Sequence, residues 1–480
     1  MKRTSIVPTP SEIKYASGML VGVKEPVKIK DASLAEEEYE IVIADGITIK
    51  ASTDKGFFYA GKTLNQIFAQ YGEVIPYMTI KDKPKYSYRS FMMDCCRHFF
   101  PLPAIKKMLD LCSDFKFNKF HWHLSEDQGW RVQIDRYPEL TKIGSVRHGT
   151  SLGTEVTSSD YGGYYTKADI KEIIEYAKER FIDVIPEIDL PGHTSALLAA
   201  IPELSCSGEK VEVKKTAGVF RDVLCVGNEK TLEVVYNILD EMCEMFPYNY
   251  FHIGGDECPR YNWKRCDKCQ ALIKKEGLQN EDELQQWFVN KVVAYLKSKG
   301  KTAIGWNESL KGGTLDKDAL IQYWTGPKEN VANCGHKIIV SDFYSHYADY
   351  PYGMTPLKKT YDYDINLCDN VVGIESPVWT EFIPSLERML YMCFPRYIAV
   401  AENGWCGNDK PEYKVFKKDL KEVSKAYDIS CWAKPNEWDQ GIIAGKIQTA
   451  KFFKEKLNDD FKAQLKEDAR IALEEKANKK

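Results

Sequence analysis

The sequence lacks two features that would place the protein in a membrane or on nucleic acid. No apolar run reaches the roughly 18 residues that a membrane-spanning helix needs, so we expect a soluble protein without membrane insertion. Cations are not in excess either, because 66 Lys and Arg face 70 Asp and Glu, a formal net charge of −4. Binding along a phosphate backbone needs a cationic surplus, so nucleic acid is not expected as a partner.

A secretory signal and a disulfide framework are also missing. The N-terminus from Met1 to Pro8 is basic but has no apolar stretch of roughly 7–15 residues. We therefore expect either a cytoplasmic protein or an exported one whose signal has been removed. The 14 cysteines comprise the adjacent pair Cys95-Cys96 and scattered single residues, which is not a small-domain disulfide pattern. Most lie in apolar stretches, where a thiol acts as a small hydrophobe, so we expect reduced thiols.

The composition and length indicate a large globular protein. Hydrophobic residues make up 44% and charged residues 28% of 480 residues, as in folded globular proteins. This length predicts about three ordinary domains, or one large barrel with a smaller companion. Aromatic residues are abundant at 12%, including 10 Trp and 28 Tyr. Such side chains suit a site for a flat, partly apolar ligand.

The first 84 residues predict a small α+β domain. Strand-like runs occur at 27–30, 39–44, 47–51 and 74–80, with a helical pattern at 55–70. The polar segment Lys81-Asp-Lys-Pro-Lys85 follows, and its proline makes it our expected domain boundary.

The next part of the chain alternates apolar runs with helical segments, which is typical of parallel βα units. Helices are expected at 103–115, with proline in the first turn, and from a capping box at Thr166 to 180. Eight strands in this arrangement predict an α/β fold, a (β/α)8 TIM barrel over residues 85–432. Residues 433–480 are predicted to form a charged, solvated helical tail. The expected strands are 91–95, 120–124, 183–188, 250–253, 302–305, 319–323, 337–340 and 371–374.

Every predicted strand ends in a charged or aromatic side chain. Active sites of such barrels lie at the carboxyl ends of the strands, so these positions point to function. A random surface would not gather several carboxylates, an arginine and three tryptophans on one rim. In chain order the rim carries Arg97, Glu126, His193, Asp256, Glu257, Trp306, Trp324, Tyr347, Asp349, Trp379 and Glu381.

Two glycines precede the adjacent carboxylates Asp256 and Glu257. Neighbouring residues of a strand point to opposite faces, so both carboxylates can reach one ligand only if the strand ends first. Gly254 and Gly255 free the backbone for that turn. Crowded carboxylates have their pKa values pushed apart, which leaves one protonated and one ionised. A surface Asp-Glu pair is the alternative interpretation, but the apolar strand and the glycines favour a catalytic pair.

The three rim tryptophans favour an aromatic-walled pocket, although any large barrel also buries some tryptophan in its core. Such walls fit the apolar face of a sugar ring and a small apolar substituent. Arg97, Asp349 and Glu381 would then supply the directional hydrogen bonds that a polyol needs. A rim salt bridge is the competing role for Arg97.

Two groups of metal-ligating residue types offer an alternative interpretation. His121 and His123 point the same way on one strand, as ligands do in barrel metallohydrolases, and His193, His252 and Asp256 could be added to them. No further histidine or lysine completes an obvious two-metal set. Another candidate is Cys266-Asp-Lys-Cys269 with Cys258 nearby, but it has no second CxxC or histidine pair to complete a tetrahedron. We therefore predict no metal.

Several separate motifs, in order, resemble the β-N-acetylhexosaminidases of glycoside hydrolase family 20 over roughly residues 5 to 425. The family has a small α+β domain before its catalytic barrel, as expected here. The motifs are Asp94-Cys-Cys-Arg-His98, His121-Trp-His-Leu-Ser-Glu-Asp-Gln-Gly-Trp130, Pro186-Glu-Ile-Asp-Leu-Pro-Gly-His193, His252-Ile-Gly-Gly-Asp-Glu257, Trp379-Thr-Glu381, and Phe394-Pro-Arg396 to Trp405.

The resemblance implies an exo-acting enzyme that removes terminal GlcNAc or GalNAc from glycans with retention. In this family the substrate's acetamido oxygen is the nucleophile and forms an oxazolinium ion, so no cofactor is expected. Glu257 would be the general acid/base, Asp256 would orient and stabilise the acetamido nitrogen, and Tyr347 would donate to its carbonyl.

The remaining roles are also carried over by resemblance. The sugar hydroxyls would be held by Arg97, Asp349 and Glu381. The acetamido group and ring would be walled by Trp306, Trp324 and Trp379. Second-layer supports would be His193 and Glu126, although relatives often have Asp at the latter position. A sugar-binding protein without catalysis is a rival, but it would be expected to lack Glu257. The sequence does not specify GlcNAc or GalNAc preference, the aglycone, or the oligomeric state.

Overall fold

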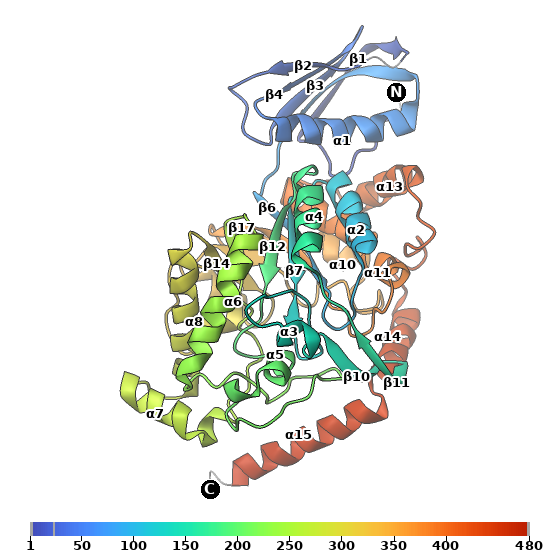
Figure 1. Cartoon of the computed structure of the whole chain (residues 1–480). Helices are drawn as coiled ribbons and strands as arrows, with labels where there is room; N and C mark the ends of the chain where they lie inside the picture. The colour runs from blue at the N-terminus through green and yellow to red at the C-terminus, as the bar shows by residue number, and fades with distance from the viewer. Residues whose placement is uncertain (1–2, 23–24, 478–480) are drawn as a thin grey trace.

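The computed structural model describes residues 3–22 and 25–477 and consists of a small sheet domain at one end of a barrel (Figure 1). The small domain has a five-stranded sheet in the order β1 (Glu12–Val21), β5 (Val74–Asp82), β3 (Tyr39–Ile43), β4 (Ile47–Ala51) and β2 (Val27–Lys30). Helix α1 (Asp54–Tyr71) packs on it. Strands β3 and β4 alternate buried and half-buried side chains, which fits a sheet with one covered face.

Eight parallel strands close into a barrel, which confirms the predicted (β/α)8 fold. Each strand pairs with its neighbour along the chain, and the last pairs with the first through Gly373 and Tyr88. In chain order the strands are β6 (Tyr88–Asp94), β7 (Lys119–His123), β12 (Asp183–Glu187), β13 (Tyr250–His252), β14 (Thr302–Trp306), β15 (Leu320–Tyr323), β16 (Ile338–Val340) and β17 (Val371–Val378).

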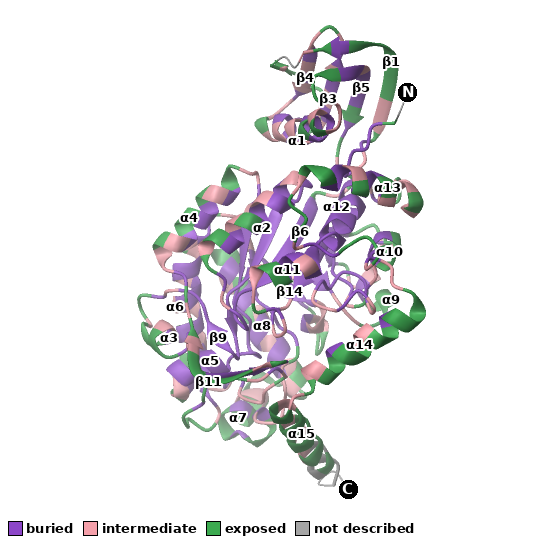
Figure 2. Ribbon diagram, turned by 90° about the vertical axis from the view of Figure 1, so that its right-hand side faces the viewer, coloured by how far each residue is buried: buried purple, intermediate pink, exposed green. Residues whose placement is uncertain are grey.

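Helices follow the barrel strands and surround them, and the predicted capping box at Thr166 and Asp169 is present. Figure 2 shows that buried residues concentrate in the barrel. The helices after α1 are α2 (Leu102–Asp114), α3 (Glu139–Lys142), α4 (Lys167–Lys178), α5 (Ser195–Ala200), α6 (Glu229–Met245), α7 (Asp267–Glu276), α8 (Glu281–Ser298), α9 (Lys328–Ala332), α10 (Leu357–Asp362), α11 (Leu386–Cys393), α12 (Arg396–Cys406), α13 (Tyr413–Val423), α14 (Ile442–Lys456) and α15 (Asp459–Ala477). None of the described helices is long and apolar enough to cross a membrane.

The sequence did not predict three strand features. Strand β1 was missed because it is an edge strand whose side chains are mostly exposed, so it carries no apolar alternation. Two hairpins also follow β7, formed by β8 (Ser125–Glu126) with β9 (Gly129–Trp130) and by β10 (Val146–Leu152) with β11 (Glu155–Gly162).

A buried ion pair joins the small domain to the barrel. Lys116 Nζ lies 2.9 Å from Asp82 Oδ2, and both side chains are fully buried. Trp405 Nε1 also donates to Asp82 Oδ1 at 2.8 Å. A second contact, of 2.8 Å, joins Arg89 Nη1 to Glu37 Oε2. These contacts fix the sheet against the end of the barrel opposite α15 (Figure 1).

The C-terminal tail is helical, as expected, but the prediction that it is only a solvated surface is wrong. Phe452 of α14 is buried, and its ring packs against Tyr350 and Phe382 at centroid distances of 5.8 and 5.5 Å. Thr216 donates to Gln464 of α15 at 2.9 Å. Tertiary contacts of a few side chains therefore hold a mostly polar segment against the barrel's carboxyl end.

Candidate active site

A cavity of about 220 Å³ opens at the carboxyl end of the barrel strands. All the predicted site residues except Trp306 line it. Segments that the sequence did not point to complete the wall, namely Ala217–Val219, Phe343, Tyr350, Phe382, Phe452, Lys456 and Phe461. Their positions follow from tertiary packing, and no sequence motif marks them.

The glycine turn after β13 aims both carboxylates into this cavity, as the sequence argument predicts. Gly254 and Gly255 have φ angles of +65° and +92°. A Cβ on Gly254 would lie 1.8 Å from Asp189 Oδ1, so only glycine fits there. The amide of Gly255 donates to the same oxygen at 3.1 Å. Asp189, which the sequence analysis did not single out, therefore holds the turn in place.

The pKa values of the two carboxyl groups are pushed apart. The pKa of Asp256 is raised and that of Glu257 is lowered, whereas an acid at Glu257 would need the reverse. Burial raises the pKa of Asp256 to about 7. Burial also acts on Glu257, but the hydrogen bond and positive charge of His193 outweigh it and lower that pKa. The Glu257 side chain is 41% exposed and that of Asp256 only 12%. Below a pH of about 7, these pKa values favour a proton on Asp256 rather than on Glu257 in the ligand-free pair.

His193 is held in this position by two carboxylates. Its Nδ1 lies 3.0 Å from Asp127 Oδ2 and 3.1 Å from Glu126 Oε1, and its Nε2 lies 3.6 Å from Glu257 Oε2. Burial opposes the imidazolium, but these acidic partners outweigh it and raise the pKa of His193 well above its usual value. Asp127 also accepts from the Ser195 amide and hydroxyl, at 2.9 and 2.5 Å. The sequence reasoning assigned no role to Asp127.

Arg97 lines the cavity and is held in place by two carboxylates. Its Nη2 lies 2.5 Å from Glu126 Oε1, and its Nη1 lies 3.3 Å from Asp94 Oδ2. The guanidinium also lies 5.0 Å from the ring centroid of Trp379. Arg97 therefore forms the rim salt bridge that was the competing interpretation, and the same side chain also lines the cavity.

Trp324, Tyr347 and Trp379 form an aromatic wall. The rings of Trp324 and Tyr347 stack at 6.3 Å with an interplanar angle of 21°. Burial raises the pKa of Tyr347 well above its usual value, so its phenol remains a donor. Trp306 lies behind the wall, 6.0 Å from Trp379. As the last residue of β14 it points into the barrel, where Nε1 donates to Glu187 Oε1 at 3.1 Å.

Several polar atoms that face this region are buried without a partner. Asp256 Oδ1, Asp349 Oδ1 and Trp324 Nε1 have no hydrogen-bond partner among the described residues. Buried polar atoms are rarely left unpaired, so these three atoms are available to a polar ligand or to water in the cavity. Burial also raises the pKa of Asp349 to about 7, and the neighbouring charge of Glu381 adds to this effect. The cavity therefore offers carboxyl groups to the hydroxyls of a polyol.

The histidines proposed for a metallohydrolase site are divided between two places. His121 and His252 lie in the barrel interior, 3.1 and 2.8 Å from oxygens of Glu187, and His123 is bonded to the same carboxylate. His193 instead belongs to the Asp127 and Glu126 group on the cavity wall. The set drawn from the sequence, with Asp256 among its ligands, is thus not brought together.

Comparison with known proteins agrees with this geometry. The family model "Glycosyl hydrolase family 20, catalytic domain" matches residues 86–408, and "Glycosyl hydrolase family 20, domain 2" matches 22–83. A beta-hexosaminidase of Porphyromonas gingivalis is 36% identical over 416 residues, covering 80% of this chain and 52% of that protein. One of Akkermansia muciniphila is 31% identical, with coverage of 87% and 89%.

Solved structures give the same result. A beta-N-acetylhexosaminidase crystal structure superposes with a TM-score of 0.83 at 29% identity, covering 89% of this chain and 97% of that one. An exo beta-N-acetylglucosaminidase from Vibrio harveyi, in complex with N-acetylglucosamine, gives 0.81 at 28% identity, with coverage of 90% and 78%. This chain spans about half the length of the Porphyromonas relative and 63% of a Vibrio furnissii one. The catalytic model covers most of the barrel, and the chain belongs to glycosyl hydrolase family 20.

Proposed function

We propose that this chain is an exo-acting β-N-acetylhexosaminidase that removes terminal β-linked GlcNAc or GalNAc from glycans with retention of configuration. The observation that carries the proposal is the turn at Gly254 and Gly255, which presents Asp256 and Glu257 to one cavity beside an aromatic wall. The relatives named beta-hexosaminidase and the chitobiase of Vibrio harveyi support the substrate class.

The substrate's acetamido oxygen attacks the anomeric carbon, forming a cyclic oxazolinium ion as the glycosidic bond breaks. Asp256 accepts from the acetamido N–H and stabilises the positive charge that develops there, so it acts mainly on the transition state. Tyr347 donates a hydrogen bond from its phenol O–H to the acetamido oxygen and thereby orients that oxygen. Glu257 protonates the leaving oxygen and then takes a proton from the water that opens the ring.

The pair must relocate its proton before this chemistry. Below a pH of about 7 the pKa values of the free protein favour a proton on Asp256, whereas the reaction needs it on Glu257. A bound sugar excludes water from the half-exposed Glu257, and desolvation raises the pKa of a carboxyl group. The acetamido N–H hydrogen-bonds to the charged form of Asp256 and lowers its pKa. Both effects of binding move the proton to the group that uses it, with no change in the pair's total charge.

The other cavity residues hold the sugar. Arg97, Asp349 and Glu381 bind the hydroxyls of the terminal residue, and the unpaired Asp349 Oδ1 provides an acceptor for one of them. Trp324 and Trp379 contact the ring and acetamido methyl, with Trp306 packed behind them as a support. His193 and Glu126 are positioning residues, since they set the orientation of Glu257 and Arg97.

A panel of aryl β-glycosides tests this function. The N-acetylglucosaminide and N-acetylgalactosaminide should be hydrolysed, whereas the matching glucoside should not, because its 2-hydroxyl cannot replace the acetamido nucleophile. NMR of the first product should show the β-anomer. Comparable turnover of the glucoside, or an initial α-anomer, would refute the mechanism.

A further inference from the structure

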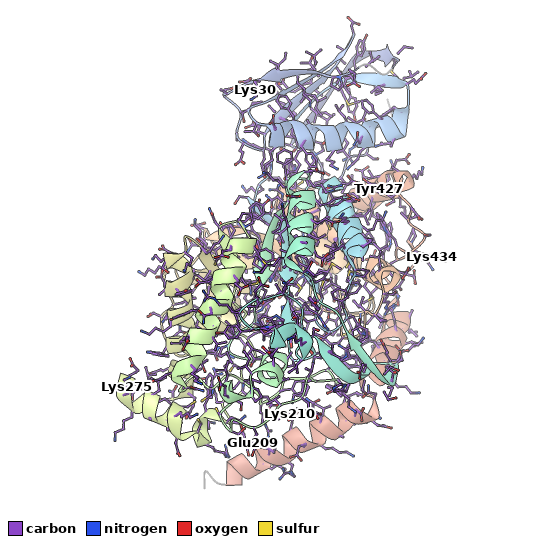
Figure 3. The ribbon with its side chains drawn as sticks, in the orientation of Figure 1. Lys30, Glu209, Lys210, Lys275, Tyr427 and Lys434 are labelled. Atoms are coloured by element: carbon purple, nitrogen blue, oxygen red, sulfur yellow. The ribbon has the colours of Figure 1, made fainter. Side chains whose placement is uncertain are left out.

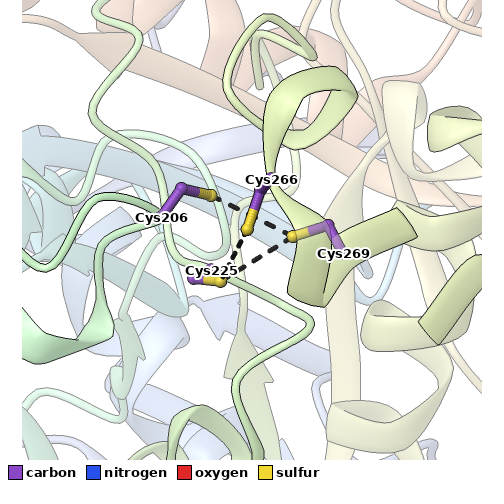
Figure 4. Close-up of side chains that lie close together, drawn as sticks. All are labelled: Cys206, Cys225, Cys266 and Cys269. Atoms are coloured by element: carbon purple, nitrogen blue, oxygen red, sulfur yellow. Dashed lines mark hydrogen bonds between the residues drawn. The ribbon is translucent and has the colours of Figure 1, made fainter. Parts of the chain in front are cut away.

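Four cysteine sulfurs converge outside the active-site cavity (Figure 4). Cys206 follows the short 3-10 helix Pro202–Leu204, Cys225 precedes α6, and Cys266 and Cys269 lie at the start of α7. The Sγ–Sγ distances are 3.6 Å for Cys225–Cys266, 3.8 Å for Cys225–Cys269 and 4.0 Å for Cys206–Cys269. All four sulfurs lie within 4.8 Å of one another.

These distances fit a metal better than a disulfide. Four thiolates about 2.3 Å from a central Zn²⁺ occupy a tetrahedron whose edges are about 3.8 Å long. A disulfide would bring two sulfurs to about 2.05 Å. The three separations cited above lie close to the tetrahedral edge, and no pair approaches bonding distance within this group. Tetrahedral sets of four sulfur ligands are typical of Zn²⁺ and of iron–sulfur sites, and Zn²⁺ is the ion to be tested here.

We propose that Cys206, Cys225, Cys266 and Cys269 bind one structural Zn²⁺ ion. The sequence shows Cys266 and Cys269 as a CxxC pair but predicts no metal there, because no second pair completes a tetrahedron. Cys206 and Cys225 precede Cys266 by 41 residues or more, and only the fold brings them to the CxxC pair. Cys258 does not belong to the group. A closed set of four cysteines leaves no open position for a substrate, so the ion's role is structural.

The backbone around the cluster is built to hold the two segments close together. A Cβ on Gly227 would lie 2.2 Å from the carbonyl carbon of Lys268 and 2.4 Å from the amide of Cys269, so only glycine allows this approach. Trp263 Nε1 donates across the same junction to the Leu224 carbonyl at 2.8 Å.

The site would brace two loops that reach the active-site cavity. The segment between Cys206 and Cys225 carries Ala217–Val219, which line the cavity, and its Glu209 and Lys210 lie at the end of the molecule near α15 (Figure 3). The second loop, residues 258–266, directly follows Glu257 and ends at Cys266. A metal that ties these segments together therefore limits the motion of one cavity wall without entering the reaction.

Metal content tests the proposal independently of activity. Protein expressed with zinc in the medium should contain one Zn per chain by mass spectrometry. The double variant Cys266→Ser/Cys269→Ser and the single variant Cys225→Ser should lose it. Cys334→Ser is the matched control, since Cys334 is a partly buried free cysteine outside the group, and it should keep one Zn. Cobalt-loaded wild-type protein should show the visible absorption bands of a tetrahedral thiolate site.

A second measurement covers variants that fail to fold. A mercurial thiol reagent added to wild-type protein should release one equivalent of Zn²⁺ to a chromogenic chelator. Proteolysis between residues 206 and 225 should then become faster. Protein that contains no zinc and shows free thiols or a disulfide at these positions would overturn the proposal, as would iron in place of zinc. Because neither measurement involves turnover, failure here is distinct from failure of the proposed hydrolase activity.

Discussion

Asp189 lies so close to Gly254 that any side chain at Gly254 would collide with its carboxyl group. The two residues follow the neighbouring strands β12 and β13, and Asp189 fixes the next amide, that of Gly255, through a 3.1 Å hydrogen bond. Burial and the nearby Asp256 raise the pKa of Asp189 well above its usual value. One carboxyl group thus shapes the turn, and its raised pKa favours the neutral form, which places no buried negative charge beside Asp256.

Gly254→Ala should disrupt catalysis through this contact. The new Cβ must displace Asp189 and with it the turn that aims Asp256 and Glu257, and a misplacement of about 1 Å can cost on the order of 10²-fold in rate. We expect a fall of that order in kcat/KM. Gly277→Ala is the control, because Gly277 also has a positive φ (+69°) but has nothing within 4 Å of its Cβ position. The control should lose about 1–2 kcal/mol of stability and keep its kcat/KM.

Phe452→Ala should weaken substrate binding, because this buried ring of α14 completes the cavity wall beside Tyr350 and Phe382. KM for an aryl N-acetylglucosaminide should rise several-fold, and kcat should change little, because no reacting atom is touched. Phe453→Ala is the matched control, since Phe453 is the next residue of the helix and is 39% exposed. Equal effects of the two substitutions on KM would contradict a role for α14 in the cavity.

Lys116→Met should destabilise the junction between the small domain and the barrel. It removes the cation that pairs with the fully buried Asp82, and breaking a buried ion pair costs about 3–5 kcal/mol. Urea denaturation should show this loss of unfolding free energy. Lys171→Met serves as the comparison, because Lys171 pairs with Glu175 on an exposed helix face and should contribute about 0–1 kcal/mol. A small effect at Lys116 would mean that the pair does not support the junction.

Most of the barrel could be predicted because each buried parallel strand is a short apolar run, and the rim could be predicted because parallel strands end at one edge. Strand β1 could not be predicted, because an exposed edge strand has neither an apolar run nor an apolar alternation. The cysteine cluster and the contribution of Phe452 were also out of reach. In both cases residues distant in the chain meet only through tertiary packing.

The protonation state of the Asp256 and Glu257 pair is another feature that the sequence predicts only in part. The sequence correctly predicts that crowding separates the two pKa values. It does not reveal which carboxyl keeps the proton, because that depends on the 3.6 Å approach of His193 to Glu257 and on the deeper burial of Asp256. Neither quantity is encoded in the local motif.

The pH dependence of kcat/KM should follow the single proton that the pair shares. Above a pH of about 7 Asp256 loses it, and below the lowered pKa of Glu257 a second proton is added, so activity should fall on both sides. In Asp256→Asn the remaining proton site is Glu257 alone. The alkaline limb should therefore move to lower pH. An alkaline limb that stays in place in this variant would show that the pair does not share its proton.

The two carboxylates should finally be separable by leaving group. In the proposed mechanism Glu257 protonates the departing oxygen, and that help matters most when the leaving group is poor, as another sugar is. A dinitrophenolate departs without protonation, so Glu257→Gln should retain far more of its cleavage rate on the dinitrophenyl substrate than on a disaccharide.

Asp256→Asn should behave differently, because in the proposed mechanism Asp256 acts on the acetamido group whatever the leaving group is. Its cleavage rates on both substrates should fall by comparable factors, on the order of the 10²–10³ that follow loss of one electrostatic stabiliser of a transition state. Pre-steady-state rates are the appropriate measurement, since Glu257 also serves the later water step and steady-state rates would mix the two. If both variants depended on the leaving group in the same way, the division of roles between Asp256 and Glu257 would have to be abandoned.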